Sequence, residues 1–277
     1  MDREKISSYI RSKKTRLKKL PPMEYGNVVW GGTYDSDICK IEQIQVDALR
    51  LITGATARSS IAALYKETRF HTILERCQFM QLIMFYKIKN GLAPTYLPTI
   101  LPQAYNSPYD LRNSGFIHKP PFRLTTFERS FVPTAIDLWN KLPDDICFLP
   151  TLASFKSTLM KRETDMYLYY YGERWPSIHH ARIRMGCSKL NYDLTFNLKV
   201  IQNPSCICGC RTEDADHFFL TCQQYSESRR KLQSLLPQRA KFDSKTLLYG
   251  DANLSHDENL VIFSAVHEFI LETRRFT

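Results

Sequence analysis

The sequence lacks several features that would assign a chain to a class directly. No apolar run approaches the length of about twenty residues that a helix needs to cross a bilayer, so we expect no transmembrane helix and no membrane partner. The first residues are basic but lack an apolar core, so they form no secretory signal, and we expect an intracellular protein, nuclear or cytoplasmic. No internal repeat is visible. Because the chain shows no secretory signal, its eight cysteines indicate thiols and metal rather than disulfides.

The composition allows a folded protein with a strongly basic surface. The chain has 277 residues, enough for one large or two modest domains, and 43% of them are hydrophobic, enough for a true core. The formal net charge is +10, and cations crowd the segment 1–21: Arg3, Lys5, Arg11, Lys13, Lys14, Arg16, Lys18 and Lys19. Such an arm favours phosphate backbones of any sequence by releasing their counterions, although a solvated tail has the same composition.

Apolar periodicity and end signals predict a mainly α fold. The predicted helices cover 36–53, 60–68, 71–90, 131–142, 152–162, a segment from a cap at Asn191 to 199, about 222–236, and a last helix that begins at a Ser255–Glu258 capping box. Five prolines break any long helix in between, so we expect an irregular or hairpin segment at about 98–130. The aromatic run 167–176 is the predicted linker between two domains.

Four metal-binding side chains fall within seventeen residues, namely Cys206, Cys208, His217 and Cys222, in the spacing C-x-C-x8-H-x4-C. Three thiolates and one imidazole suit a closed tetrahedral zinc site. The two early cysteines can reach one metal only if the chain turns there, and Gly209 tolerates the positive φ of such a turn. His217 fits if it lies at the end of a loop or in the first turn of a helix. The spacing therefore predicts a structural Zn²⁺ ion.

The sequence leaves alternatives open for this motif. Cys210 can replace Cys206, with Cys208 as the other early ligand. The pattern C-x-C indicates a metal less strongly than paired C-x2-C does. An alternative interpretation is therefore that these residues are free, buried cysteines beside an apolar helix, with no metal bound. A catalytic zinc would need an open position and a general base, and we assign that role to neither Glu213 nor Asp214.

Cationic side chains both inside and outside the arm are candidates for contacts with RNA and/or DNA, mainly through phosphates. The segment 110–127 mixes cations with aromatic rings that can stack on bases, although an ordinary irregular loop has the same composition. The predicted nucleic-acid-binding residues are Lys13, Lys14, Arg16, Lys18, Lys19, Arg112, Arg123, Arg182, Arg184, Arg229 and Arg230. The pair His179–His180 is predicted to be surface polar rather than metal-binding.

Six stretches, taken in order, carry a resemblance to a known family. They are Met23–Trp30 (MEYGNVVW), Ala48–Gly54 (ALRLITG), Phe85–Tyr96 (FYKIKNGLAPTY), Tyr109–Asn113 (YDLRN), Ser130–Pro143 (SFVPTAIDLWNKLP) and the Cys206–Arg229 segment with its Cys, His, Tyr and Arg spacing. In number and order they resemble the C-terminal part of the reverse transcriptases of non-LTR (LINE-type) retrotransposons. The resemblance runs from about residue 22 to residue 277.

The resemblance implies a helical thumb-like or connection region over 22–165 and a helical zinc-binding domain over 175–277, after the basic arm. The family is an RNA-directed DNA polymerase, whose catalytic metal ions are held by carboxylates on an aromatic-x-Asp-Asp strand. The only Asp-Asp pair here, Asp144–Asp145, follows a helix end and lacks the aromatic residue. We therefore expect a truncated product of such an element, without polymerase activity of its own, and assign no catalytic residue.

Three kinds of function compete at this point. The first, which we favour, is a module that binds RNA or DNA without strict sequence preference and contains structural zinc. The second is a helical scaffold or interaction protein, or a gene-model fragment, without independent activity. The third is an enzyme, such as a nuclease or a subunit that completes a split polymerase, and it requires a carboxylate cluster that the sequence does not display.

Overall fold

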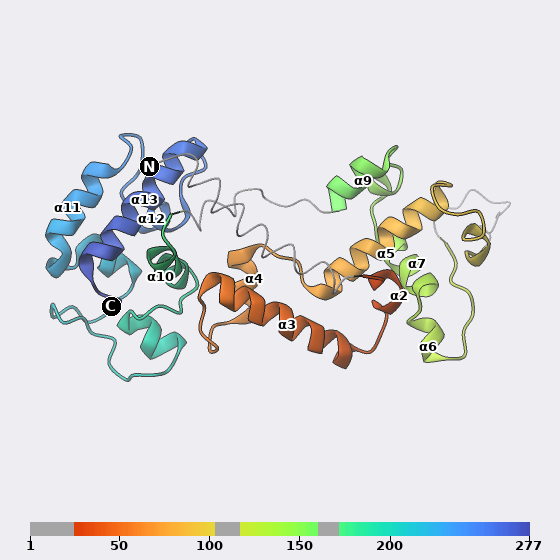
Figure 1. The fold of residues 1–277 in the computed structure, drawn as a ribbon, viewed down its shortest axis with the longest axis horizontal. Helices are drawn as coiled ribbons and strands as arrows, with labels where there is room; N and C mark the ends of the chain where they lie inside the picture. Colours follow the sequence, from red (N-terminus) through yellow and green to blue (C-terminus); the bar gives the residue numbers. More distant parts are fainter. Residues whose placement is uncertain (1–24, 103–116, 160–171) are drawn as a thin grey trace. The chain divides into compact units, whose positions relative to one another are not determined.

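The computed structural model describes residues 25–102, 117–159 and 172–277, and in these ranges the protein is mainly helical and contains no strand (Figure 1). The predicted mainly α fold is thus confirmed. The described parts of 98–130 are irregular with two short helices, η2 (Pro98–Ile100) and α6 (Thr125–Glu128). The basic arm 1–21, Arg112 and residues 167–171 of the predicted linker lie outside the described residues.

The chain divides into two compact units, and each combines stretches that are separate in the sequence. One, here called the C-terminal unit, combines Val46–Phe70 with the described residues of Glu163–Thr277. The other, here called the middle unit, contains the described residues of Leu17–Gln45 and His71–Arg162. The division falls within one helix, α3 (Asp35–Thr53): its residues up to Gln45 belong to the middle unit, and those from Val46 belong to the C-terminal unit.

Helix α5 (Ile73–Lys89) is the centre of the middle unit, and α2 (Asn27–Trp30), α7 (Phe131–Asn140) and α9 (Leu152–Leu159) pack against it. Its core is aromatic: the rings of Tyr86 and Phe155 stack at 4.4 Å, and Trp139 lies within 6.5 Å of both. The Tyr86 hydroxyl donates to the Leu149 carbonyl at 2.7 Å, which satisfies the polar end of a buried ring. The short helix α8 (Asp144–Cys147) follows α7.

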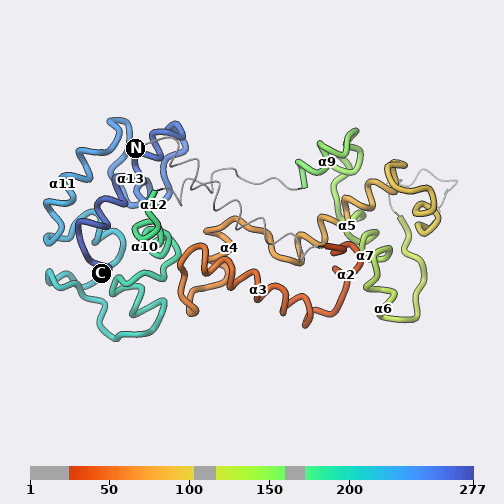
Figure 2. Tube along the Cα trace, in the orientation of Figure 1, coloured from red at the N-terminus to blue at the C-terminus, as the bar shows by residue number. Residues whose placement is uncertain are grey.

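Helix α13 (His256–Thr273) is the centre of the C-terminal unit, and α10 (Arg174–Arg184), α11 (Ser226–Leu235) and α12 (Ser244–Tyr249) pack against it (Figure 2). Between α10 and α11 the chain forms two π-helical turns, η4 (Asp193–Asn197) and η5 (His217–Thr221), and the 3-10 turn η6 (Gln223–Tyr225). Phe218 and Phe219 of η5 are fully buried against Phe269 of α13, which anchors that turn in the core.

Several helix ends agree with their sequence signals. Ser255 and Glu258 form the predicted capping box, in which each side chain accepts from the backbone N–H of the other. Gly54 follows α3 with φ 70°, the left-handed conformation that a helix C′ position favours. A helical segment begins at Asn191 as predicted, but the side chain of Asn191 does not cap it and instead donates to the Ser205 carbonyl at 2.6 Å.

The prediction that His179 and His180 are surface polar residues is also wrong. Their exposed fractions are 5% and 0%. His180 Nε2 lies 3.0 Å from the Leu247 carbonyl, and its Nδ1 lies 3.3 Å from Nε2 of His267 on α13. Because a carbonyl only accepts, the geometry assigns the proton of His180 to Nε2, so its Nδ1 accepts from His267. His180 therefore joins α10 to both α12 and α13 inside the core.

Within the ranges that the structure covers, no helix is both long enough and apolar enough to traverse a bilayer.

Candidate metal centre

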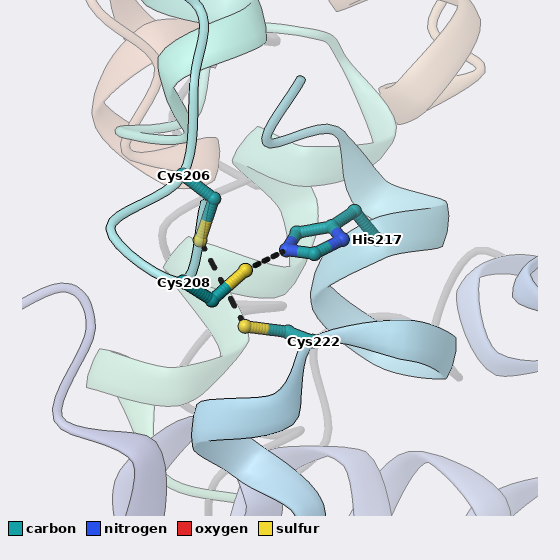
Figure 3. A group of neighbouring side chains, drawn as sticks. All are labelled: Cys206, Cys208, His217 and Cys222. Atoms are coloured by element: carbon teal, nitrogen blue, oxygen red, sulfur yellow. Dashed lines mark hydrogen bonds between the residues drawn. The ribbon is translucent and has the colours of Figure 1, made fainter. Parts of the chain in front are cut away.

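The structure brings the four predicted ligands together (Figure 3). One ligand atom from each of Cys206, Cys208, His217 and Cys222 lies within 4.8 Å of the others. The sulfurs of Cys206 and Cys222 are 3.8 Å apart, and Cys208 Sγ is 3.2 Å from His217 Nε2. Zinc–sulfur bonds of about 2.3 Å in a tetrahedron place two sulfurs about 3.8 Å apart, so the donor set fits a tetrahedral ion.

The first two ligands project from a tight turn, as the sequence predicts. The backbone N–H of Gly209 donates to the Cys206 carbonyl at 3.0 Å, and that of Cys206 donates to the Cys210 carbonyl at 2.9 Å. Gly209 has φ 93°, a conformation that residues with a Cβ rarely adopt. Ile207 at the tip of the turn is 86% exposed, so the turn is held by its backbone and not by apolar burial.

The other two ligands lie at the ends of the π-helical turn η5. Its wide hydrogen bond runs from the Cys222 N–H to the His217 carbonyl at 2.8 Å. Residues five apart therefore lie above one another, which is the separation that His217 and Cys222 need to share an ion. The His217 N–H also donates to Asp214 Oδ1 at 2.7 Å, which fixes the start of the turn.

Contacts beyond the ligands orient them. His217 Nδ1 lies 3.1 Å from the Thr221 hydroxyl, which leaves Nε2 to face the three sulfurs. Arg229 of α11 donates to the Cys222 carbonyl at 2.6 Å and to the Phe219 carbonyl at 2.8 Å. The end of η5 is thus held in place by a charged side chain.

The thiols of the cluster differ in acidity. The backbone N–H of Cys210 donates to Cys208 and lowers the pKa of that thiol below its ordinary value. Burial raises the pKa of Cys206 to about 12 and raises that of Cys222. A bound divalent metal would supply the positive charge that Cys206 and Cys222 need to become thiolates at neutral pH.

The alternative ligand Cys210 is not part of the group, whereas Cys206 is. In the part of the chain that the structure describes, this is the one group of three or more Cys, His, Asp or Glu side chains placed to hold a metal. The pair Asp144–Asp145 is exposed in the first turn of α8.

Three of the predicted phosphate-binding arginines have hydrogen-bond partners within the C-terminal unit. The Arg184 side chain is 0% exposed and forms a two-pronged ion pair with Glu67 of α4 (Ile61–Thr68), with Nη2–Oε1 at 2.7 Å. Arg182 donates to the Gly54 carbonyl at 2.7 Å. With Arg229, already described, these arginines satisfy carbonyls and a carboxylate within the C-terminal unit. The sequence shows their charge but not the partners that the fold brings to them.

The other predicted phosphate-binding residues fall into two groups. Arg123 and Arg230 are exposed, and Arg230 pairs with the exposed Glu227 on its own helix, at 2.9 Å. Outside the described residues lie Lys13, Lys14, Arg16, Lys18, Lys19 and Arg112. Two cations thus remain on the described surface from the predicted set.

Sequence reasoning missed one contact of the site. The guanidinium of Arg275 pairs with buried Glu213, with both N–O distances 2.6 Å. The one feature of the sequence that could have indicated a role for Glu213 is its position inside the Cys/His segment, seven residues after Cys206. Nothing in the local pattern links it to a residue 62 positions away.

Comparisons of the chain with models of protein families, with curated proteins and with solved structures found no match.

Proposed function

We propose that Cys206, Cys208, His217 and Cys222 bind a structural Zn²⁺ ion. Three sulfurs and one imidazole nitrogen within 4.8 Å of one another carry this proposal. Soft thiolates with an imidazole favour zinc among the common divalent ions, and four protein ligands leave no position for a reacting water. The ion would supply folding energy by joining the turn at Cys206–Cys210 to η5.

Metal content tests the zinc site. We expect one zinc per chain for the purified protein in mass spectrometry under native conditions, and less than a tenth of that occupancy for Cys206→Ser/Cys208→Ser. Cys147→Ser, which changes a thiol of the middle unit, is the matched control and should retain the metal. A wild-type protein without zinc, or a double variant with full zinc, would contradict the proposal.

We further propose that the protein binds RNA or DNA through phosphates and bases, as the resemblance to the C-terminal region of non-LTR retrotransposon reverse transcriptases implies. The net charge of +10 supports this function. So does an exposed pair of rings in the C-terminal unit: Tyr192 and Phe196 are 39% and 53% exposed, with centroids 4.9 Å apart. Exposed rings of this kind stack on unpaired bases.

Filter binding over a range of salt concentrations tests this second proposal. We expect retention of single-stranded RNA at low salt and a steep, linear fall of log affinity with log salt. Tyr192→Ala/Phe196→Ala should weaken binding by about tenfold or more, since stacking contributes about 1–3 kcal/mol per base. Tyr96→Ala, at an exposed ring of the middle unit, should leave it unchanged. No retention at low salt, or affinity independent of salt, would favour a helical scaffold.

A further inference from the structure

The ion pair of Glu213 and Arg275 lies directly beside the metal ligands. Glu213 Oε1 is 4.0 Å from Cys206 Sγ, and the Glu213 side chain is 3% exposed. Arg275 donates from Nε to Oε1 and from Nη2 to Oε2, both at 2.6 Å. This carboxylate therefore has one oxygen shared between a ligand sulfur and a guanidinium.

Without the arginine, two negative charges would lie side by side in this arrangement. A zinc ion with three thiolates and a neutral imidazole has a net formal charge of about −1. Glu213 adds a second negative charge, buried and next to one of the sulfurs. Like charges that close disfavour each other strongly where water is excluded. Arg275 cancels the charge of Glu213 at hydrogen-bond distance.

Arg275 is held in this position from several sides. Its Nη2 also donates to the Lys189 carbonyl at 2.9 Å. The next residue, Phe276, is 2% exposed and stacks on the ring of His179 with centroids 4.8 Å apart. Phe276 also contacts the ring of Phe218, the neighbour of the ligand His217, at 5.4 Å. The guanidinium thus reaches Glu213 from a packed backbone segment.

Glu213 in turn connects the two chain segments around the turn of the first ligands. Its backbone N–H donates to the Pro204 carbonyl at 2.8 Å, and its carboxylate accepts from the Asn191 N–H at 3.0 Å. The pair therefore has a mechanical role, in joining these segments, and an electrostatic one. The two roles predict different results for substitutions of its two members.

We propose that Arg275 is a positioning residue of the metal centre, which holds Glu213 beside Cys206 and offsets its negative charge so that the anionic zinc–thiolate group can form. This inference rests on the proposed zinc site. On the electrostatic role, removal of Arg275 leaves an uncompensated carboxylate beside the thiolates and weakens metal binding. Removal of the Glu213 charge leaves a cation beside the anionic centre and does not weaken it.

Competition with a chromogenic chelator for Zn²⁺, with Co²⁺ absorption as a second measure of thiolate ligation, tests the proposal. We expect Arg275→Gln to raise the Kd for Zn²⁺ by about 10–100-fold, the range for contacts outside the ligands themselves. Glu213→Gln should leave the Kd unchanged or lower it. Arg275→Lys, which keeps the charge, should recover most of the lost affinity, and the exposed Arg230→Gln should match wild type.

The outcomes separate the two proposals. A wild-type protein that binds no Zn²⁺ overturns the zinc site itself. A wild-type protein that binds Zn²⁺ with the same Kd as Arg275→Gln overturns the role of Arg275. Equal losses in Arg275→Gln and Glu213→Gln assign the pair a purely mechanical role and overturn it too. If Arg275→Gln does not fold, Glu213→Gln decides alone, because a tenfold weaker Kd there contradicts the proposal.

Discussion

At the scale of single residues, the C-terminal unit contains an ion pair that is buried in its interior. Arg184 and Glu67 are 0% and 5% exposed, lie 117 positions apart in sequence, and meet at 2.7 Å. Their pairing attaches α4 to α10, which is one reason that residues 46–70 belong to the C-terminal unit. A buried ion pair stabilises the folded state little compared with apolar residues of the same volume. Removal of one member, however, leaves the charge of the other buried without its counterion.

We therefore expect Glu67→Ala to lower the free energy of unfolding of the C-terminal unit by about 3–5 kcal/mol, measured by urea denaturation. The double variant Glu67→Met/Arg184→Leu should lose much less, because no charge then remains buried. Glu227→Ala, which breaks the exposed pair with Arg230, should change stability by less than about 1 kcal/mol. Equal effects of Glu67→Ala and Glu227→Ala would show that burial does not govern these pairs.

At the scale of elements, α10 and α13 are joined by histidines that the core keeps uncharged. Burial lowers the pKa of His267 to about 3 and that of His179 to about 4, and it lowers the pKa of His180 well below the ordinary value. Arg184 and Arg182 add to these shifts because their positive charges lie nearby. The folded state therefore favours the neutral form of these three imidazoles.

The sign of the resulting pH dependence follows from these directions. Between the folded pKa and the ordinary value of 6.5, the unfolded chain binds more protons than the folded one. The stability from His267 is therefore complete above pH 6.5 and is lost as pH falls toward about 3. Each such histidine adds about 1.4 kcal/mol per pH unit to the slope. His267→Gln should reduce the slope below pH 6 by about that amount in denaturation curves, and an unchanged slope would contradict this account.

At the scale of the whole molecule, two units with separate cores occur in one chain, and the metal ligands belong to only one of them. The middle unit is held by an aromatic core around Trp139, whereas the turn that carries Cys206 and Cys208 is held by its backbone hydrogen bonds, with Ile207 exposed. Units of this kind unfold independently when their cores are not shared.

We expect metal removal by a chelator to act locally. Hydrogen exchange followed by mass spectrometry should show loss of protection near 200–235, because the energy of metal binding there is folding energy. Amides of α5 and α7 in the middle unit should keep their protection. Uniform loss of protection over both units would show that they fold as one, and unchanged exchange near 200–235 would show that the region is stable without the ion.

Much of the local structure could be predicted from the sequence. The helix 36–53, the turn at Gly209 and the capping box at Ser255 match the structure within a residue or two, because each depends on neighbours in sequence. The group of four candidate metal ligands could be predicted for the same reason, since their chemistry and spacing are confined to one short segment. The Asn191 cap was wrong because a side-chain bond to Ser205, in another segment, took its place.

The sequence alone therefore determined the mainly α character, most helix positions and the group of four candidate ligands, since these depend on periodicity, capping and short-range spacing. Only the tertiary structure decided which charges are internal, that His179 and His180 are buried, and that Arg275 lies beside the metal ligands. These outcomes depend on which distant segments meet in a core. Charge, hydropathy and spacing along the chain do not specify that.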